Sequence, residues 1–304
     1  MTRKDYAIRL EGVEALDLPF GVLRDLHDVL VIGSQRCARL MVEGRSSARG
    51  ALPAWLPSVG DLRISRFAAG SLELGVTAPT LSDAAPDLFA PQALGSPLPP
   101  DATAMDLLLD AVTDASTNRT ESERLDPGIL EVLARAGSLF GRGATRLVIT
   151  REHHEPTVLD PTSIETVRAL SAATPLPRVT RVRGILDSLT VSTTAVALQL
   201  EDGRSLRGFG GTDSVETLRV LLGSDVVLEG VVTFRPSGEA LRIDIESATL
   251  ATPNDALWAR LPKAERHSTR PRLPAQSSDL DDLFGAWPGD ESDAELAAAL
   301  AALS

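Results

Sequence analysis

Three adjacent residues, His153, His154 and Glu155, carry side chains that could bind a metal ion. Neighbouring residues on an extended segment point to opposite faces, so these three groups cannot converge on one ion without a bend. We therefore predict an exposed loop there, with no metal site.

Cys37 is the only cysteine of the chain, which excludes an internal disulfide and a zinc site built from several thiolates. It lies on an apolar stripe of helical spacing, and no histidine stands at a spacing that would activate it. We expect a buried core thiol and not a nucleophile.

The sequence contains no phosphate-binding loop of the form GxxxxGK, no GxSxG turn for a nucleophilic serine and no HExxH zinc helix. Gly208, Gly210 and Gly211 surround Phe209, but no lysine is near, and Asp213 would repel a phosphate at the start of the next helix. We predict a protein that is not an enzyme, with no catalytic residue and no cofactor.

Composition narrows the class of protein further. The chain has 304 residues with a formal net charge of −12, a balance that repels nucleic-acid phosphates and anionic lipids. It lacks an N-terminal signal segment and any run of about 18 apolar residues. These features predict a cytoplasmic protein that does not bind membranes. Of the 30 basic residues only Lys4 and Lys263 are lysine, and Ala and Gly are frequent, a bias that indicates a GC-rich bacterial genome.

Residues 1–177 are predicted to form an α+β domain. The alternation at 5–12 indicates a strand, and apolar residues spaced by three and four from Leu23 to Met41 indicate a helix. Six prolines in 79–101 mark a connector and a candidate sub-boundary. The other predicted elements are strands at 62–67, 71–76 and 145–150 and helices at 102–115, 127–140 and 162–172.

Residues 178–250 show three strands, a helix and two further strands, with a hairpin turn at Asp202-Gly203. This order resembles an OB-like five-stranded β-barrel. Such barrels often bind single strands through a basic groove and stacking aromatic rings. This one has eight arginines against ten acidic residues, and Phe209 and Phe234 are its only aromatic residues, so nucleic-acid binding is disfavoured.

From residue 251 onward the charge and the proline content of the sequence differ from those of the preceding residues. Residues 251–276 form a basic, proline-rich linker, and 277–304 hold seven acidic residues and no basic one. Within that acidic tail, apolar residues at helical spacing predict two short amphipathic helices that bind a partner in a groove. The predicted partner-binding residues are Leu280, Leu283, Phe284, Trp287, Leu296 and Leu300.

Alone, the tail is not expected to fold. Burying about six large apolar side chains yields roughly 10–15 kcal/mol, whereas ordering about 28 residues costs roughly 1–2 kcal/mol each. Either the tail packs on the rest of the chain, or it folds on a second protein.

Residues 282–296, which read DLFGAWPGDESDAEL, resemble the C-terminal segment of VapB-type antitoxins. The resemblance implies a PIN-domain ribonuclease toxin as the partner. Such antitoxins commonly place an arginine at the toxin's metal site; here that role would fall to Arg266, Arg270 or Arg272, unless an acidic side chain approaches the metal. The N-terminal DNA-binding domain usual in that family is replaced here by an acidic α+β region and a barrel, so operator binding is not implied.

The leading hypothesis is thus an antitoxin-like protein that neutralises a PIN-domain ribonuclease through its tail. The alternative is an OB-fold adaptor that binds single-stranded nucleic acid and recruits proteins with its acidic tail.

Overall fold

The chain divides into two units, Met1–His267 and Ser268–Ser304, and all the residues described below belong to the first. None of the described helices combines the length and the apolar composition needed to cross a lipid bilayer. The computed structural model describes residues 2–14, 18–47, 52–68, 71–89, 98–191, 193–211 and 214–264.

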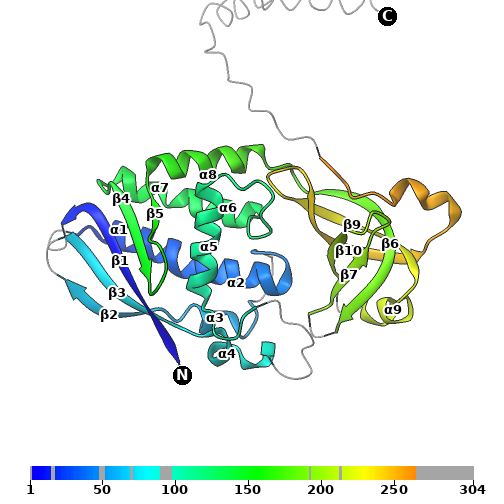
Figure 1. Cartoon of the computed structure of the whole chain (residues 1–304), viewed down its shortest axis with the longest axis horizontal. Coiled ribbons are helices and arrows are strands. Elements are labelled where there is room, and N and C mark those ends of the chain that lie inside the picture. Colours follow the sequence, from blue (N-terminus) through cyan, green and yellow to red (C-terminus); the bar gives the residue numbers. More distant parts are fainter. Residues whose placement is uncertain are drawn as a thin grey trace, which may run out of the picture. The chain divides into compact units, whose positions relative to one another are not determined.

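The N-terminal domain is built on one antiparallel sheet with the strand order β2-β3-β1-β4-β5 (Figure 1). The alternation that predicted the first strand is confirmed, because Tyr6, Ile8 and Leu10 of β1 are buried in the same core as the helices. The strands are β1 (Arg3–Glu14), β2 (Arg63–Ala68), β3 (Ser71–Pro79), β4 (Arg146–Arg151) and β5 (Thr157–Leu159).

The helices of this domain supply the rest of its core. The helix predicted from Leu23 to Met41 is present as two α-helices, α1 (Phe20–His27) and α2 (Gly33–Glu43). A π-helical turn, Asp28–Ile32, joins them without a break. The 79–101 segment is more regular than its prolines suggest: it contains α4 (Leu81–Ala84) and a 3₁₀ turn, Pro86–Phe89. The other helices are α3 (Leu56–Val59), α5 (Ala104–Ser116), α6 (Pro127–Arg135), α7 (Gly137–Gly141) and α8 (Pro161–Ala173).

Three of these helices begin at polar caps. Thr103 and Asp106 form a reciprocal capping box at α5, while Asp126 and Asp160 each accept a backbone N–H at the start of α6 and α8. A proline in the first turn of α6 and α8 fixes the backbone at a position that needs no N–H donor.

Residues 178–250 form a closed five-stranded β-barrel with the strand order β10-β8-β7-β6-β9. Strands β10 and β8 pair in parallel, and the other neighbours pair antiparallel. The alternating apolar residues line the interior, where the ring of Phe234 is fully buried. The elements are β6 (Arg178–Thr190), β7 (Ala195–Gln199), β8 (Ser205–Phe209), α9 (Val215–Val220), β9 (Asp225–Phe234) and β10 (Ala240–Leu250).

The first residues of the predicted linker fold onto the barrel. A 3₁₀ helix, η5 (Pro253–Trp258), lies against β6, and Thr252 and Asp255 cap it reciprocally. The chain then returns to the β9–β10 turn, where the N–H of Ala264 donates to the carbonyl of Gly238 over 2.8 Å. The described barrel therefore extends to Ala264.

The N-terminal domain and the barrel meet at the C-terminal end of α2. The last carbonyls of a helix lack partners within the helix and carry partial negative charge. Here Arg207 of β8 donates to the carbonyl of Met41 over 3.2 Å, and buried Arg242 of β10 donates to the carbonyl of Gly44. The ring of Phe209 lies directly against Gly44. We call this contact the domain joint.

The β9–β10 turn extends the domain joint. Arg235 forms an ion pair with Glu123 at 3.0 Å, and the hydroxyl of Ser237 donates to the carboxylate of Glu121 over 3.0 Å. The backbone N–H of Ser237 also donates to the carbonyl of Thr120. The barrel is thus attached by β8, by β10 and by the turn between β9 and β10.

Gly44 allows this close approach, because a Cβ at that position would overlap the ring of Phe209 and its φ of +68° disfavours any other residue. We expect Gly44→Ala to lower the free energy of unfolding by about 3 kcal/mol or more, through overpacking added to left-handed strain. Urea denaturation measures this change.

The matched control is Gly203→Ala in the β7–β8 turn, where φ is +81° and no atom lies within 4 Å of the added Cβ. It should cost only about 1 kcal/mol, from backbone strain alone. Equal losses in the two variants would contradict the role given to the contact with Phe209.

Candidate functional site

The residues predicted to bind a partner all lie outside the described residues. This holds for Leu280, Leu283, Phe284, Trp287, Leu296 and Leu300, and for the predicted blocking arginines Arg266, Arg270 and Arg272. Their roles stay predictions.

The structure confirms two expectations about reactive side chains, the burial of Cys37 and the exposure of His153 and His154. Cys37 is buried in the core, and burial, with Asp126 and Asp110 adding to it, raises the pKa of its thiol far above the usual range. His153 and His154 lie in an exposed turn after β4, where His153 has a φ of +60°. Among the described residues no group of three or more His, Cys, Asp or Glu side chains could hold a metal ion.

A buried polar network joins β1 to the start of α5. The hydroxyl of Tyr6 lies 2.6 Å from that of Thr103 and donates to the carboxylate of Asp106 over 2.9 Å. Asp106 also forms ion pairs with Lys4 and with Arg151. Burial raises the pKa of Tyr6, so this phenol stays protonated and serves as a donor within the core.

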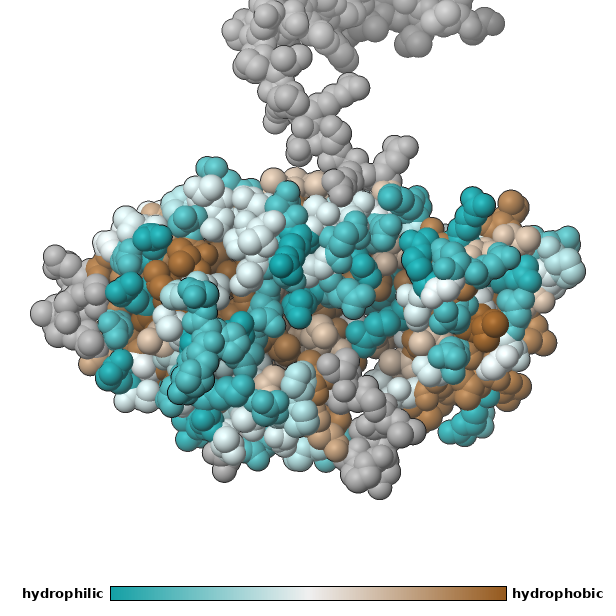
Figure 2. Space-filling model, in the orientation of Figure 1, coloured by the Kyte–Doolittle hydropathy of each residue, from teal (hydrophilic) through white to brown (hydrophobic). Residues whose placement is uncertain are grey.

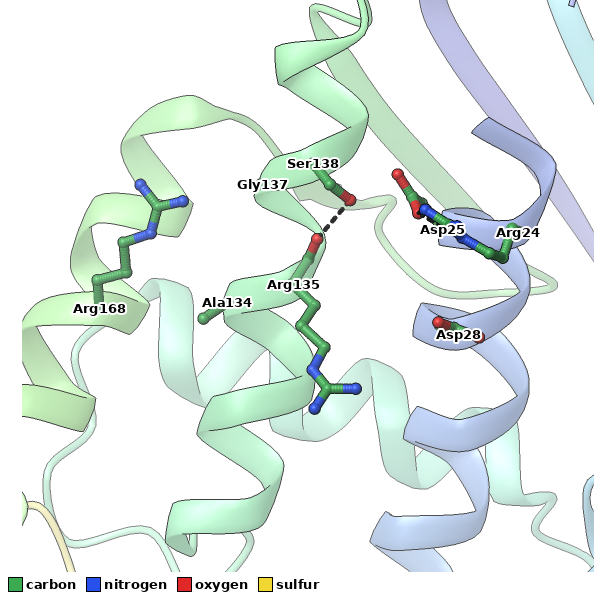
Figure 3. Close-up of a pocket in the computed structure, with 8 residues that line it drawn as sticks. All are labelled: Arg24, Asp25, Asp28, Ala134, Arg135, Gly137, Ser138 and Arg168. Carbon is green, nitrogen blue, oxygen red and sulfur yellow. Dashed lines mark hydrogen bonds and ion pairs between the residues drawn. The ribbon is translucent and has the colours of Figure 1, made fainter. Parts of the chain in front are cut away.

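An open pocket of about 520 Å³ lies between α1, the α6–α7 junction and α8 (Figure 3). Three of its side chains end in guanidinium groups, which commonly bind carboxylates and phosphates. It is lined by Arg24, Asp25, Asp28, Ala134, Arg135, Gly137, Ser138 and Arg168.

The buried carboxylate of Asp25 is the centre of the pocket's electrostatics. Burial pushes its pKa upward, but Ser138, Arg142 and Arg24 more than offset this, so the pKa lies below its usual range. Arg142 donates to Asp25 over 3.0 Å and Arg24 over 3.1 Å. The carboxylate of Asp25 points from α1 toward Ser138 and so links α1 to α7 (Figure 3).

The three guanidinium groups do not converge on one point. Figure 3 shows Arg168 on the opposite side of the α6–α7 junction from Arg24. Arg24 and Arg135 are paired with Asp25 and Glu131, and within the described residues Arg168 has no ion-pair partner. The pocket is therefore a junction of helices in which two of the three guanidinium groups are paired with carboxylates, and it lacks a nucleophile, a base and an oxyanion site in mutual reach.

Sequence reasoning did not find this pocket, because its residues come from separate helices and share no periodic pattern. Stacking on a nucleic-acid base requires an exposed aromatic ring. The barrel strands carry two aromatic residues, Phe209 and Phe234, and Trp258 of η5, which is 36% exposed, lies outside the strands. Phe209 is only 6% exposed, at the domain joint, and Phe234 is fully buried. Neither ring is available to a nucleic-acid base in this structure.

Comparison with known proteins gives no relative: the chain matches no protein-family model, no curated protein and no solved structure.

The lowered pKa of Asp25 predicts how the free energy of unfolding depends on pH. Because its pKa is lower in the folded protein, its carboxylate stabilises the fold at neutral pH, and this contribution disappears as the pH falls through the folded-state pKa. Asp25→Asn should lower the free energy of unfolding at pH 7 by about 1–3 kcal/mol, since it weakens the contacts with Arg142 and Arg24.

Urea denaturation of both proteins from pH 7 down to pH 3 measures the difference. The gap between wild type and Asp25→Asn should shrink as the pH falls. A gap that stays constant over this range would show that the charge of Asp25 does not stabilise the fold.

Proposed function

We propose that this chain is an antitoxin-like, non-enzymatic protein that neutralises a PIN-domain ribonuclease through its C-terminal residues 277–304. The observation that carries the proposal is the tail itself. Large apolar residues at positions i, i+3, i+4 and i+7 stand in a segment with seven acidic residues and no basic one. That segment lies wholly within the second unit of the chain, Ser268–Ser304.

We infer that the barrel is of the OB type, which bears on where the protein binds its partner. Its third and fifth strands, β8 and β10, pair in parallel, its first and fourth strands, β6 and β9, pair antiparallel, and α9 lies between the third and fourth. OB barrels bind oligonucleotides on the face of the second and third strands, on the loop between the first and second, and on the loop between the fourth and fifth.

In this chain the N-terminal domain covers part of the corresponding surface. Arg207 and Phe209 of the third strand contact the end of α2, and Arg235 and Ser237 of the loop contact residues 120–123. This arrangement gives less support to the alternative, an adaptor that binds single-stranded nucleic acid through the barrel. It supports the tail as the partner-binding segment and the two domains as the body that carries it.

In the complex, the tail forms two amphipathic helices. Leu280, Leu283, Phe284 and Trp287 fill the groove of the ribonuclease from the first helix, and Leu296 and Leu300 from the second. The basic residues that precede them, Arg266, Arg270 and Arg272, are the candidates to approach the acidic metal site of the nuclease.

The direct test is Trp287→Ala. Removing a buried aromatic anchor should weaken binding by about 2 kcal/mol or more, which raises the Kd about 30-fold. We would measure it by calorimetry with the full chain against active-site-inactivated PIN-domain ribonucleases of the same genome. Asp282→Ala is the matched control, because position 282 lies on the opposite side of the same predicted helix. An unchanged Kd for Trp287→Ala would refute the proposal.

Ending the chain at Gln276 provides a second test. If the tail contributes nothing to the body's core, the melting temperature of the shortened protein should stay within about 2 °C of the full chain, while inhibition of the ribonuclease is lost. A fall of many degrees would mean that the tail packs on the body and is part of its own core.

A further inference from the structure

Strand β2 forms one edge of the N-terminal sheet, and no described element covers its free side. Its one neighbour in the strand order is β3, which is also the one described element with which it packs extensively (Figure 1). At the opposite edge, β5 packs against α5 and α8. An open edge strand offers unpaired backbone N–H and C=O groups to another strand.

The helical layer of this domain ends between β3 and β2. Figure 2 shows apolar side chains at the surface of the N-terminal domain with polar ones around them. Leu74 and Val76 of β3 are buried against the helices. Phe67 and Ile64 of β2 stand opposite them on the same face of the sheet, yet they are 54% and 64% exposed and belong to neither buried core. Two large apolar side chains thus lie on the helix side of the sheet without a described helix over them.

A β-bulge keeps Ile64 and Phe67 on one face although they are three residues apart. Ser65 is the extra residue, so Ser65 and Arg66 share the position opposite Gly75. A Cβ added to Gly75 would lie 2.9 Å from the hydroxyl of Ser65 and 3.0 Å from the Cβ of Arg66, which places both side chains on the outer face. The faces of residues 64–67 are therefore inner, outer, outer and inner, an order that is the same in both chain directions.

We propose that β2 pairs antiparallel with β2 of a second copy of this chain, about a two-fold axis between residues 65 and 66. Such a strand meets its own pattern reversed, and the symmetric order of faces in residues 64–67 satisfies this condition. Ile64 of each copy then stands opposite Phe67 of the other, which makes two cross-strand apolar pairs on the helix side. The helical layers of both copies lie on that side, and the four side chains cover one another between them.

The charges on β2 permit this pairing. Arg63 forms an ion pair with Asp61 at 2.9 Å and Arg66 with Glu73 at 3.4 Å, both within one chain. In the proposed register Arg66 stands opposite Ser65, and Arg63 stands opposite residue 68. No arginine therefore faces another arginine directly, and none points into the apolar side. The pairing does not depend on the proposed function, and each copy keeps its own tail.

The test is the oligomeric state of the full chain in sedimentation velocity. A contact built on one six-residue strand is small, so we expect a monomer–dimer equilibrium with a Kd of about 10–100 μM. Phe67→Asp and, independently, Ile64→Asp should each raise that Kd at least tenfold, because a carboxylate would face an apolar side chain. Val220→Asp is the control, because Val220 is 78% exposed on α9 of the barrel. It should leave the Kd unchanged, and thermal melting confirms that each variant is folded.

A nitroxide label on Ser65→Cys identifies the surface that pairs. Ser65 is exposed, whereas the native thiol of Cys37 is buried and stays unlabelled. The two labelled positions would lie about 5–8 Å apart across the two-fold axis. At dimer-forming concentrations the labels should therefore broaden each other's electron paramagnetic resonance spectrum, and dilution should remove the broadening.

Each outcome decides the proposal. Weaker dimers in both β2 variants, an unchanged Kd in Val220→Asp and a broadened spectrum at position 65 establish the pairing. A full chain that stays monomeric far above the expected Kd refutes it, as does an unchanged Kd in both β2 variants or a dimer without broadening. A monomer that dimerises only when the chain ends at Gln276 would show that the tail, and not a second copy, occupies β2.

Discussion

The contact between the C-terminal end of α2 and the barrel is the constraint on which the other features depend. Unpaired helix carbonyls need donors, and buried guanidinium groups need acceptors. Arg207 and Arg242 meet both needs at once, at Met41 and at Gly44. The lack of a side chain at Gly44 lets the ring of Phe209 lie against the backbone there.

One carboxylate connects this contact to the core of the N-terminal domain. Asp126 caps α6 by accepting the N–H of Ile129 over 2.9 Å, and it accepts the hydroxyl of Ser46 over 2.7 Å. Arg242 lies 3.7 Å from it. The start of α6, the segment after α2 and strand β10 therefore share one buried anion, which ties the orientation of the barrel to the packing of the helices.

Sequence patterns predicted the parts of this fold that depend on short-range periodicity. The alternation in β1, the spacing from Leu23 to Met41 and the Asp202-Gly203 turn each indicated the observed element. The domain joint could not be predicted in this way, because Gly44 and Phe209 are 165 residues apart and no repeat relates them. A glycine after a helix commonly marks the C-terminal end of that helix, but the residues around Gly44 give no sign of a contact with an aromatic ring. The pocket around Asp25 escaped prediction for the same reason, and η5 was hidden in a segment whose prolines suggested an extended linker.

The β9–β10 turn has a mechanical meaning. Its residues Arg235 and Ser237 hold the N-terminal domain, and its residues Gly238 and Glu239 hold the last described residues before the tail, Lys263 and Ala264. Tension applied to the C-terminus would therefore enter the body through this one hairpin and be shared between both domains. A pull on the tail would therefore meet the contacts of this hairpin with both domains before it acted on the other strands of the barrel.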